Sequence, residues 1–235
     1  WPGWLGPAQE QMAAFASAVA ESGQEVRLLV RDEANEARAR ALASSKVTLE
    51  RRTYGDVWLR DTGPLVVTHA DGRRSARRFG FNGWGGKFPS EKDNAVIRNL
   101  HTLGVFGTTP LHPVDLILEG GSIESDGAGT LLTTTQCLLN SNRNPQLTKE
   151  QIEERLKEEL GVHTFLWLEN GSLSGDDTDA HIDTLARLCP NKTIVYVACD
   201  DPVDEHYENL KVMEQELMQF PGYRLIPLPW PSAKF

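Results

Sequence analysis

The sequence is poor in cysteine, carries fewer basic than acidic side chains and has no long apolar run. Its three cysteines, Cys137, Cys189 and Cys199, are too few and too irregularly spaced for a disulfide framework or a CxxC zinc site. Each stands in or beside an apolar segment, which favours buried free thiols and a reducing compartment, the cytoplasm. A secreted form stays an alternative, because the first residue is Trp1 and not Met.

Positive charge is also scarce, with 24 Lys and Arg residues against 33 Asp and Glu residues and a net charge of −9. This balance argues against nucleic acid or an anionic membrane as a partner and favours a cationic one. No segment reaches the roughly eighteen apolar residues of a membrane span, and none resembles a signal peptide. We therefore expect a globular chain that binds neither nucleic acid nor membrane.

What the sequence does contain is a unit of hairpin, helix and strand that recurs about every sixty residues. The hairpins turn at Asp71–Gly72, Asp126–Gly127 and Pro190–Lys192. Helices are predicted at 91–103, 148–160 and 203–220, and strands follow them at 114–118, 163–168 and 223–228. Two helices, 7–22 and 33–43, and two strands, 25–30 and 47–49, are predicted before the first hairpin. Residues 54–67 read as a strand broken near Asp61, and residues 79–90 as a loop.

Three chemically reactive side chains follow the same period. Asp61, Glu119 and His181 each stand at the entrance to a hairpin, 58 and 62 positions apart. A radial arrangement of the units would bring all three to a common centre. The stretch 175–188 adds further carboxylates: a strand would point Asp179 and Asp183 to the side of His181, and a helix would stack Asp179 on Asp183. A solvated acidic turn is the simpler alternative for this stretch.

A pocket lined by several carboxylates needs a cation, since desolvating them together is costly. A metal ion is one candidate, and a metal-dependent hydrolase would use Asp179, His181 and Asp183 as ligands. A guanidinium is the other, because planar carboxylates can pair with it bidentately and Trp58 offers an aromatic face. The guanidinium explains more of the residues.

Several other residues have simpler interpretations. Trp84, flanked by glycines, is predicted at a pocket rim rather than in the core. Arg60 and Arg143 are expected in structural ion pairs. Asp176 and Asp177 are expected to be solvated, because they precede the predicted strand.

Five segments together resemble the agmatine deiminase family, which includes the bacterial type of peptidylarginine deiminase. They are DVWLRDTGP at 56–64, FNGWGGKF at 81–88, LEGGSIESDGAGTLL at 118–132, CLLNSNRNP at 137–145 and TDAHIDTLARL at 178–188. The resemblance covers nearly the whole chain in the same order. It implies a pentein fold, an α/β propeller of ββαβ units, which agrees with the period of about sixty residues.

The resemblance also implies roles for individual residues. Asp61 and Asp183 would clamp the guanidinium nitrogens, with Trp58 and Trp84 near the substrate, while Glu119 and His181 would move protons. The implied reaction converts agmatine to N-carbamoylputrescine and ammonia through a covalent Cys-thiouronium intermediate, with no metal and no cofactor. A peptidylarginine deiminase acting on C-terminal arginine and an inactive guanidinium-binding module are alternatives. A homodimer is considered as the assembly.

Two departures from the family pattern stand out. The family's nucleophilic cysteine lies near the C-terminus in a GGGxxHC-like context, which this sequence lacks, and its three cysteines are assigned to hairpin strands that place none of them well. We therefore expect a single pentein domain, residues 1–235, that is incomplete at both ends and inactive alone. In addition, Ala180 stands where the family has glycine, which matters if a positive φ is required there.

Overall fold

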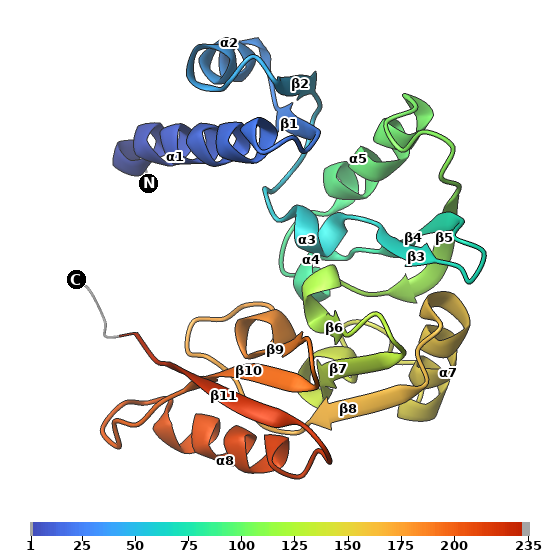
Figure 1. Ribbon diagram of the computed structural model, residues 1–235, viewed down its shortest axis with the longest axis vertical. Helices are drawn as coiled ribbons and strands as arrows, with labels where there is room; N and C mark the ends of the chain where they lie inside the picture. The colour runs from blue at the N-terminus through green and yellow to red at the C-terminus, as the bar shows by residue number, and fades with distance from the viewer. Residues whose placement is uncertain (1, 232–235) are drawn as a thin grey trace. The chain divides into compact units, whose positions relative to one another are not determined.

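The computed structural model describes residues 2–231 and divides into two compact units, Trp1–Val57 and Trp58–Phe235 (Figure 1). The prediction that residues 1–235 form one pentein domain stays a prediction.

The first unit alternates helices and strands. Its elements are α1 (Pro2–Glu21), β1 (Val26–Val30), α2 (Glu33–Leu42) and β2 (Val47–Arg51), and β1 pairs with β2 in parallel. The Asp32 side chain caps α2 by accepting a hydrogen bond from the backbone N–H of Asn35, as expected at a helix start. Ala16 and Ala20 of α1 form a small core with Val47.

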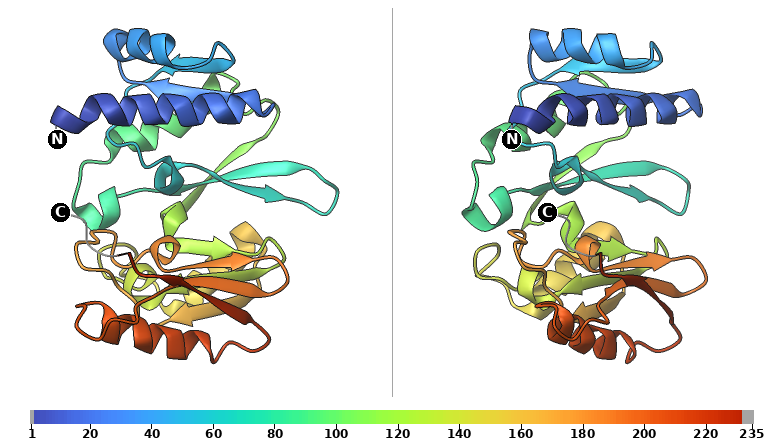
Figure 2. Two further views of the ribbon diagram at one scale, coloured as in Figure 1. Left: turned by 60° about the vertical axis from the view of Figure 1, so that its left-hand side comes forward. Right: turned by 90° about the vertical axis from the view of Figure 1, so that its left-hand side faces the viewer.

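The second unit contains three repeats of one topology, visible from different sides in Figure 2. In each repeat, an antiparallel hairpin is followed by a helix and by a strand that pairs in parallel with the second hairpin strand. The repeats are β3 (Leu65–Thr68), β4 (Arg74–Gly80), α5 (Glu91–Thr102) and β5 (Leu111–Ile117); β6 (Ile123–Ser125), β7 (Thr130–Thr134), α7 (Lys149–Leu160) and β8 (Thr164–Leu168); and β9 (Ala186–Cys189), β10 (Thr193–Ala198), α8 (Tyr207–Leu217) and β11 (Arg224–Pro229). The predicted ββαβ period is therefore confirmed.

Local sequence explains α7 in particular. Thr148 and Gln151 form a reciprocal capping box, and Gly161 ends the helix in the left-handed conformation, with φ of 70°. Ile152 and Leu156 point into a core that also contains Leu131 of β7. A second core packs Ile194 of β10 against Met213 of α8. These two cores hold the second and third repeats.

Short segments at the hairpin entrances differ from the sequence prediction. Residues 59–62 are a helical turn, α3 (Leu59–Thr62), where a broken strand was predicted, and the expected loop 79–90 contains a tight turn, α4 (Gly83–Gly86). The part of the acidic stretch that carries Asp179, His181 and Asp183 forms neither the predicted strand nor the alternative helix. It bends through left-handed backbone at Asp179 and Ala180, with φ of 67° and 64°, and ends in a 3₁₀ turn, η2 (Ile182–Thr184).

Among residues 2–231, none of the helices combines the length and the apolar character that crossing a membrane requires.

Candidate active site

Three residues distant in sequence meet where the repeats begin. Asp61 lies in α3, Glu119 directly precedes the 3₁₀ turn η1 (Gly120–Ser122), and His181 directly precedes η2. The Asp61 Oδ1 atom is 3.6 Å from His181 Nδ1. The exposed fractions of Asp61, Glu119 and His181 are 8%, 0% and 2%. The structure thus gathers the three periodic side chains, and their catalytic roles stay proposals.

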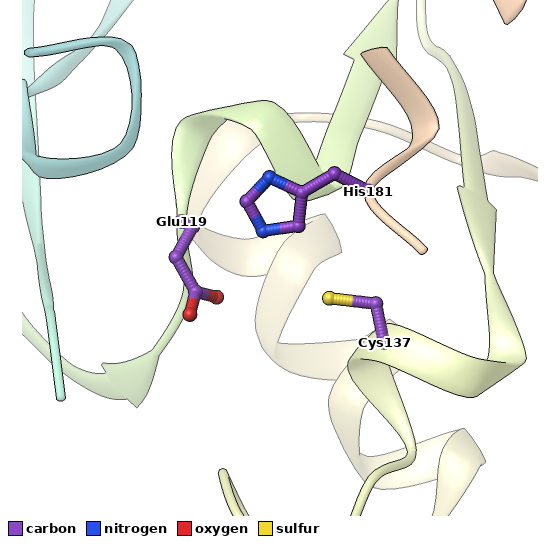
Figure 3. A group of neighbouring side chains, drawn as sticks. All are labelled: Glu119, Cys137 and His181. Carbon is purple, nitrogen blue, oxygen red and sulfur yellow. The ribbon is translucent and has the colours of Figure 1, made fainter. Parts of the chain in front are cut away.

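The site has two sides that share the imidazole of His181. On one side, donor atoms of Asp61, His181 and Asp183 lie within 4.8 Å of one another. On the other side, the same holds for Glu119, Cys137 and His181, whose side chains point toward one another in Figure 3. Among the described residues, the buried Nε2 atom of His181 has no hydrogen-bond partner.

The two glycines after Glu119 allow this close approach. A Cβ at Gly120 would lie 2.1 Å from the carbonyl oxygen of Arg60. A Cβ at Gly121 would lie 2.6 Å from carboxylate oxygens of both Asp61 and Asp183. The Gly121 backbone N–H donates to Asp61 Oδ1 at 2.9 Å. Only glycine therefore lets the backbone lie against the site and fix one of its carboxylates.

Trp84 has an exposed fraction of 5% and lies in the core, so the prediction of a pocket rim is wrong. Its indole Nε1–H donates to Asp61 Oδ2 at 3.0 Å, and its ring packs edge-on against Phe81 and Phe88. The backbone of Trp84 is left-handed, with φ of 54°, between glycines that share this conformation. This turn directs the ring inward, where the indole holds Asp61 in place. Contact of Trp84 with a substrate stays a prediction.

Glu119 forms a fully buried ion pair with Arg143. The Arg143 Nε atom donates to both carboxylate oxygens, at 2.9 and 3.1 Å, and both side chains have an exposed fraction of 0%. The sequence predicted an ion pair for Arg143 but not its partner. The NRNP part of the CLLNSNRNP segment was the sequence feature that could have indicated a role for Arg143 at the site. Arg60, by comparison, approaches Glu124 only to 4.0 Å.

Asp179 belongs to a different set of contacts from His181 and Asp183. Its carboxylate accepts hydrogen bonds from Lys87, Arg143 and Asn142, at 2.7, 2.7 and 3.0 Å. Although burial opposes ionisation, these hydrogen bonds lower the pKa of Asp179 to about 2. The metal set predicted from Asp179, His181 and Asp183 is therefore not formed.

Asp183 is half-buried and has a different electrostatic environment. Burial, together with the nearby negative charge of Asp61, raises the pKa of the Asp183 carboxyl, and His181 partly opposes this effect. Of the residues described, neither Asp61 nor Asp183 has a Lys or Arg within ion-pairing distance. A cation placed between Asp61 and Asp183 would therefore gain more electrostatic stabilisation than one placed elsewhere in the site.

Cys137 lies closer to the site than the sequence suggested. It is in the helical turn α6 (Thr135–Leu138), not in a hairpin strand, and it contacts the carbonyl oxygen of Thr178, with Sγ at 3.7 Å. Burial raises the pKa of its thiol far above the usual range, so the thiolate is not populated near neutral pH. Cys199 is buried as predicted, whereas Cys189 is partly exposed.

Trp58 and Asp176 lie on segments that lead into the site. Trp58, just before α3, has an exposed fraction of 61%, and its contact with substrate stays a prediction. Asp176 was expected to be solvated, but its carboxylate accepts from the backbone N–H groups of Thr178 and Ala180, at 2.9 and 2.8 Å. It therefore shapes the turn that carries His181, while Asp177 is exposed as expected.

Either side of His181 offers three donor atoms that could hold a metal ion. On the Glu119 side, the guanidinium of Arg143 already pairs with the carboxylate, and the Cys137 proton would have to leave. The Asp61 side offers two carboxylates and one imidazole nitrogen, a set that fits an oxygen-preferring metal or an organic cation.

The ββαβ repeats, with carboxylates and an imidazole gathered at the hairpin entrances, define a pentein-type α/β protein with an anionic centre. The chain belongs to the Porphyromonas-type peptidyl-arginine deiminase family, whose model matches residues 1–235.

Individual relatives agree with this assignment. A Mycoplasma capricolum protein named "Putative agmatine deiminase" is 40% identical over 211 residues, which cover 88% of this chain and 56% of the relative. A Shewanella protein of the same name is 42% identical over 180 residues, covering 74% of this chain and 48% of that protein. The chain thus spans about half the length of the curated relatives it matches.

Solved structures give the same result. A C. jejuni agmatine deiminase variant with substrate bound superposes with a TM-score of 0.91 and 40% identity, over 100% of this chain and 68% of that one. The agmatine deiminase of Enterococcus faecalis superposes with a TM-score of 0.86 and 29% identity, over 97% of this chain and 64% of that one. These likenesses confirm the predicted pentein fold and the family resemblance.

Proposed function

We propose that the protein is a guanidine deiminase that converts agmatine to N-carbamoylputrescine and ammonia. The observation that carries the proposal is the convergence of Asp61 and Asp183 on His181, with Glu119 on the opposite side of the imidazole. The names of the relatives support the same reaction.

A guanidinium suits the Asp61 side of the site for electrostatic and geometric reasons. Two carboxylates drawn together in a partly desolvated place are stabilised by a permanent positive charge between them. A planar guanidinium also offers several N–H donors that match carboxylate oxygens in pairs. Trp84 and the Gly121 N–H already hold Asp61 in one orientation, so less freedom is lost on binding.

The chemistry would then be covalent, with protons moved by His181 and Glu119. A cysteine thiolate attacks the central guanidinium carbon, and the carbon–nitrogen bond breaks as His181 protonates the departing ammonia. Water activated by His181 next attacks the thiouronium carbon, which releases the ureido product and restores the thiolate. Cys137 is a poor nucleophile because its thiol keeps its proton. The family's C-terminal cysteine is therefore the expected nucleophile.

The test uses the full-length protein and a colorimetric assay for the ureido product from agmatine. Glu119→Gln and His181→Asn should each lower turnover by about a hundred- to ten-thousand-fold, because each removes a proton-transferring group. Glu208→Gln and His163→Asn, which change exposed side chains of the same types, serve as matched controls and should leave turnover unchanged. Wild-type turnover in either site variant would contradict the proposal.

The description of the matching family favours one alternative class of substrate, a peptidyl-arginine. The family resemblance implies that this arginine is at the C-terminus of the peptide. Comparing kcat/KM for agmatine with that for a peptide ending in arginine decides between the two. Binding of both without product would instead indicate an inactive guanidinium-binding module. The cytoplasmic location and the homodimer stay predictions.

A further inference from the structure

We propose that Arg143 is a positioning residue that fixes Glu119 and the turn carrying His181 in one working geometry. The inference rests on the proposed function and deepens it, because it names the group that holds the two proton-transferring residues together. The side chain of Arg143 is fully buried, and each nitrogen of its guanidinium donates to a protein group.

Toward Glu119, Arg143 supplies both charge and orientation. Its Nε–H is shared between the two carboxylate oxygens, at 2.9 and 3.1 Å, in a place where neither side chain is exposed. A carboxylate without a partner is costly to bury, so this contact offsets the cost of burying the Glu119 carboxylate. The same contact fixes the rotation of the Glu119 carboxyl group, and each carboxylate oxygen keeps lone pairs that can accept a further hydrogen bond.

Toward His181, Arg143 holds the preceding turn. Its Nη1 atom donates to Asp179 Oδ2 at 2.7 Å, and its Nη2 atom donates to the Thr178 carbonyl oxygen at 2.8 Å. The hydroxyl of Thr178 accepts a hydrogen bond from the His181 backbone N–H at 3.2 Å. Asp179 and Ala180 have left-handed backbone, which side-chain-bearing residues keep only where their surroundings impose it.

The neighbours of Arg143 complete a rigid connection between these two parts. The Asn144 amide side chain accepts from the backbone N–H of Ile117 and donates to its carbonyl oxygen, at 3.0 and 2.8 Å. The turn is thereby fixed to the end of β5, two residues before Glu119. The Asn142 side chain contacts Arg143 and Asp179, at 2.9 and 3.0 Å. The NRNP turn therefore links the Glu119 segment to the His181 segment.

Arginine is needed because each of its nitrogens has a different partner. Nε binds Glu119, Nη1 binds Asp179 and Asn142, and Nη2 binds Thr178. Lysine has the same charge, but its single ammonium cannot reach all four partners in one plane. The substitution Arg143→Lys therefore keeps the positive charge at position 143 but removes most of the hydrogen bonds that position Glu119 and the His181 turn.

The experiment compares Arg143→Lys and Arg143→Ala with Arg77→Ala in the full-length protein. Arg77 is a matched control, since it forms a partly buried ion pair with Glu159, at 2.9 Å, outside the site. We expect kcat for agmatine to fall about 100-fold in Arg143→Ala and about 10-fold in Arg143→Lys. KM should stay within about threefold, because Asp61 and Asp183 keep their contacts. The inference would be overturned if kcat of both Arg143 variants lay within about twofold of kcat of Arg77→Ala. It would also be overturned if the Arg143 variants changed KM alone.

A second measurement does not depend on turnover. Amide hydrogen exchange across residues 175–184 should be at least about tenfold faster in Arg143→Lys than in wild type and unchanged in Arg77→Ala. If Arg143→Ala fails to fold, Arg143→Lys decides the kinetic test. If the wild-type protein makes no ureido product, the proposed function is wrong, and the hydrogen-exchange measurement alone tests the role of Arg143. Unchanged exchange in Arg143→Lys would then refute that role.

Discussion

At the scale of single residues, Gly121 determines how closely the site can assemble. Its backbone N–H binds Asp61 at 2.9 Å, and the space where a Cβ would stand is bounded by Asp61, Asp183 and His181. The φ of Gly121 is not positive, so the requirement for glycine is steric and does not come from the backbone conformation. The site thus depends on the absence of a side chain as much as on the side chains it contains.

Gly121→Ala should therefore damage binding directly. The new Cβ would lie 2.6 Å from two carboxylate oxygens and 2.7 Å from His181 Nδ1, so these groups must move apart. We expect the Kd for agmatine, measured by calorimetry on the full-length protein, to rise at least about 100-fold, with a stability cost of about 1–3 kcal/mol. Gly6→Ala, in helix α1 with open space around it, should leave the Kd unchanged. An unchanged Kd in Gly121→Ala would contradict this account of the site.

At the scale of elements, each ββαβ repeat depends on a helix that crosses between parallel strands. The sequence marks the start of α7 clearly, through the reciprocal contacts of Thr148 and Gln151. Ile152 and Leu156 then pack into the core that includes Leu118, next to Glu119. The helix therefore supports the segment that presents Glu119.

Thr148→Ala should destabilise the protein by about 1 kcal/mol, because an N–H at the helix start loses its side-chain partner. Urea denaturation measures the free energy of unfolding. Thr102→Ala, at the last residue of α5, removes an exposed Thr with no capping role and should change stability by less than about 0.5 kcal/mol. Equal effects of the two substitutions would show that the capping box does not stabilise α7.

At the scale of the whole second unit, Asp179 joins segments from three repeats. Lys87 follows the hairpin of the first repeat, Arg143 follows that of the second, and Asp179 precedes that of the third. Contacts of this kind between repeats depend on the ionised carboxylate, so they link stability to pH.

The sign of this linkage follows from the lowered pKa of Asp179. Its pKa falls from 3.8 to about 2 in the folded protein, so its contribution is complete above pH 3.8 and is lost as the pH falls toward 2. We expect the free energy of unfolding to fall less steeply across this range in Asp179→Asn than in wild type, as measured by urea denaturation at each pH. The exposed neighbour Asp177, changed to Asn, should keep the wild-type slope. Identical slopes for Asp179→Asn and wild type would exclude Asp179 as a source of the pH dependence.

Local features of the sequence were sufficient to predict most of the fold. Hairpin turns such as Asp126–Gly127, the Thr148 capping box and Gly161 act over a few residues, so their effects can be read without tertiary structure. The spacing of Asp61, Glu119 and His181 likewise predicted that they meet, because repeats of one topology place equivalent positions alike.

The predictions were wrong for side chains whose hydrogen-bond partners are distant in the sequence. The alternation expected for a strand placed Asp179 beside His181, but left-handed backbone turns it toward Lys87 and Arg143. The glycines around Trp84 suggested a pocket rim, yet its buried indole N–H donates a hydrogen bond to Asp61, 23 residues away. Neither outcome has a local signal in the sequence.

The sequence by itself determined the repeat, the hairpin turns, the bounds of α7 and the three residues that meet at the centre, because hydrophobic periodicity and capping are local. It placed the helices 7–22 and 203–220 less accurately, since these are Pro2–Glu21 and Tyr207–Leu217 in the structure. Only the tertiary structure decided which charge pairs with which. Glu119 and Arg143 are 24 positions apart, and their pairing depends on desolvation and distance, which exist only once the repeats have packed together.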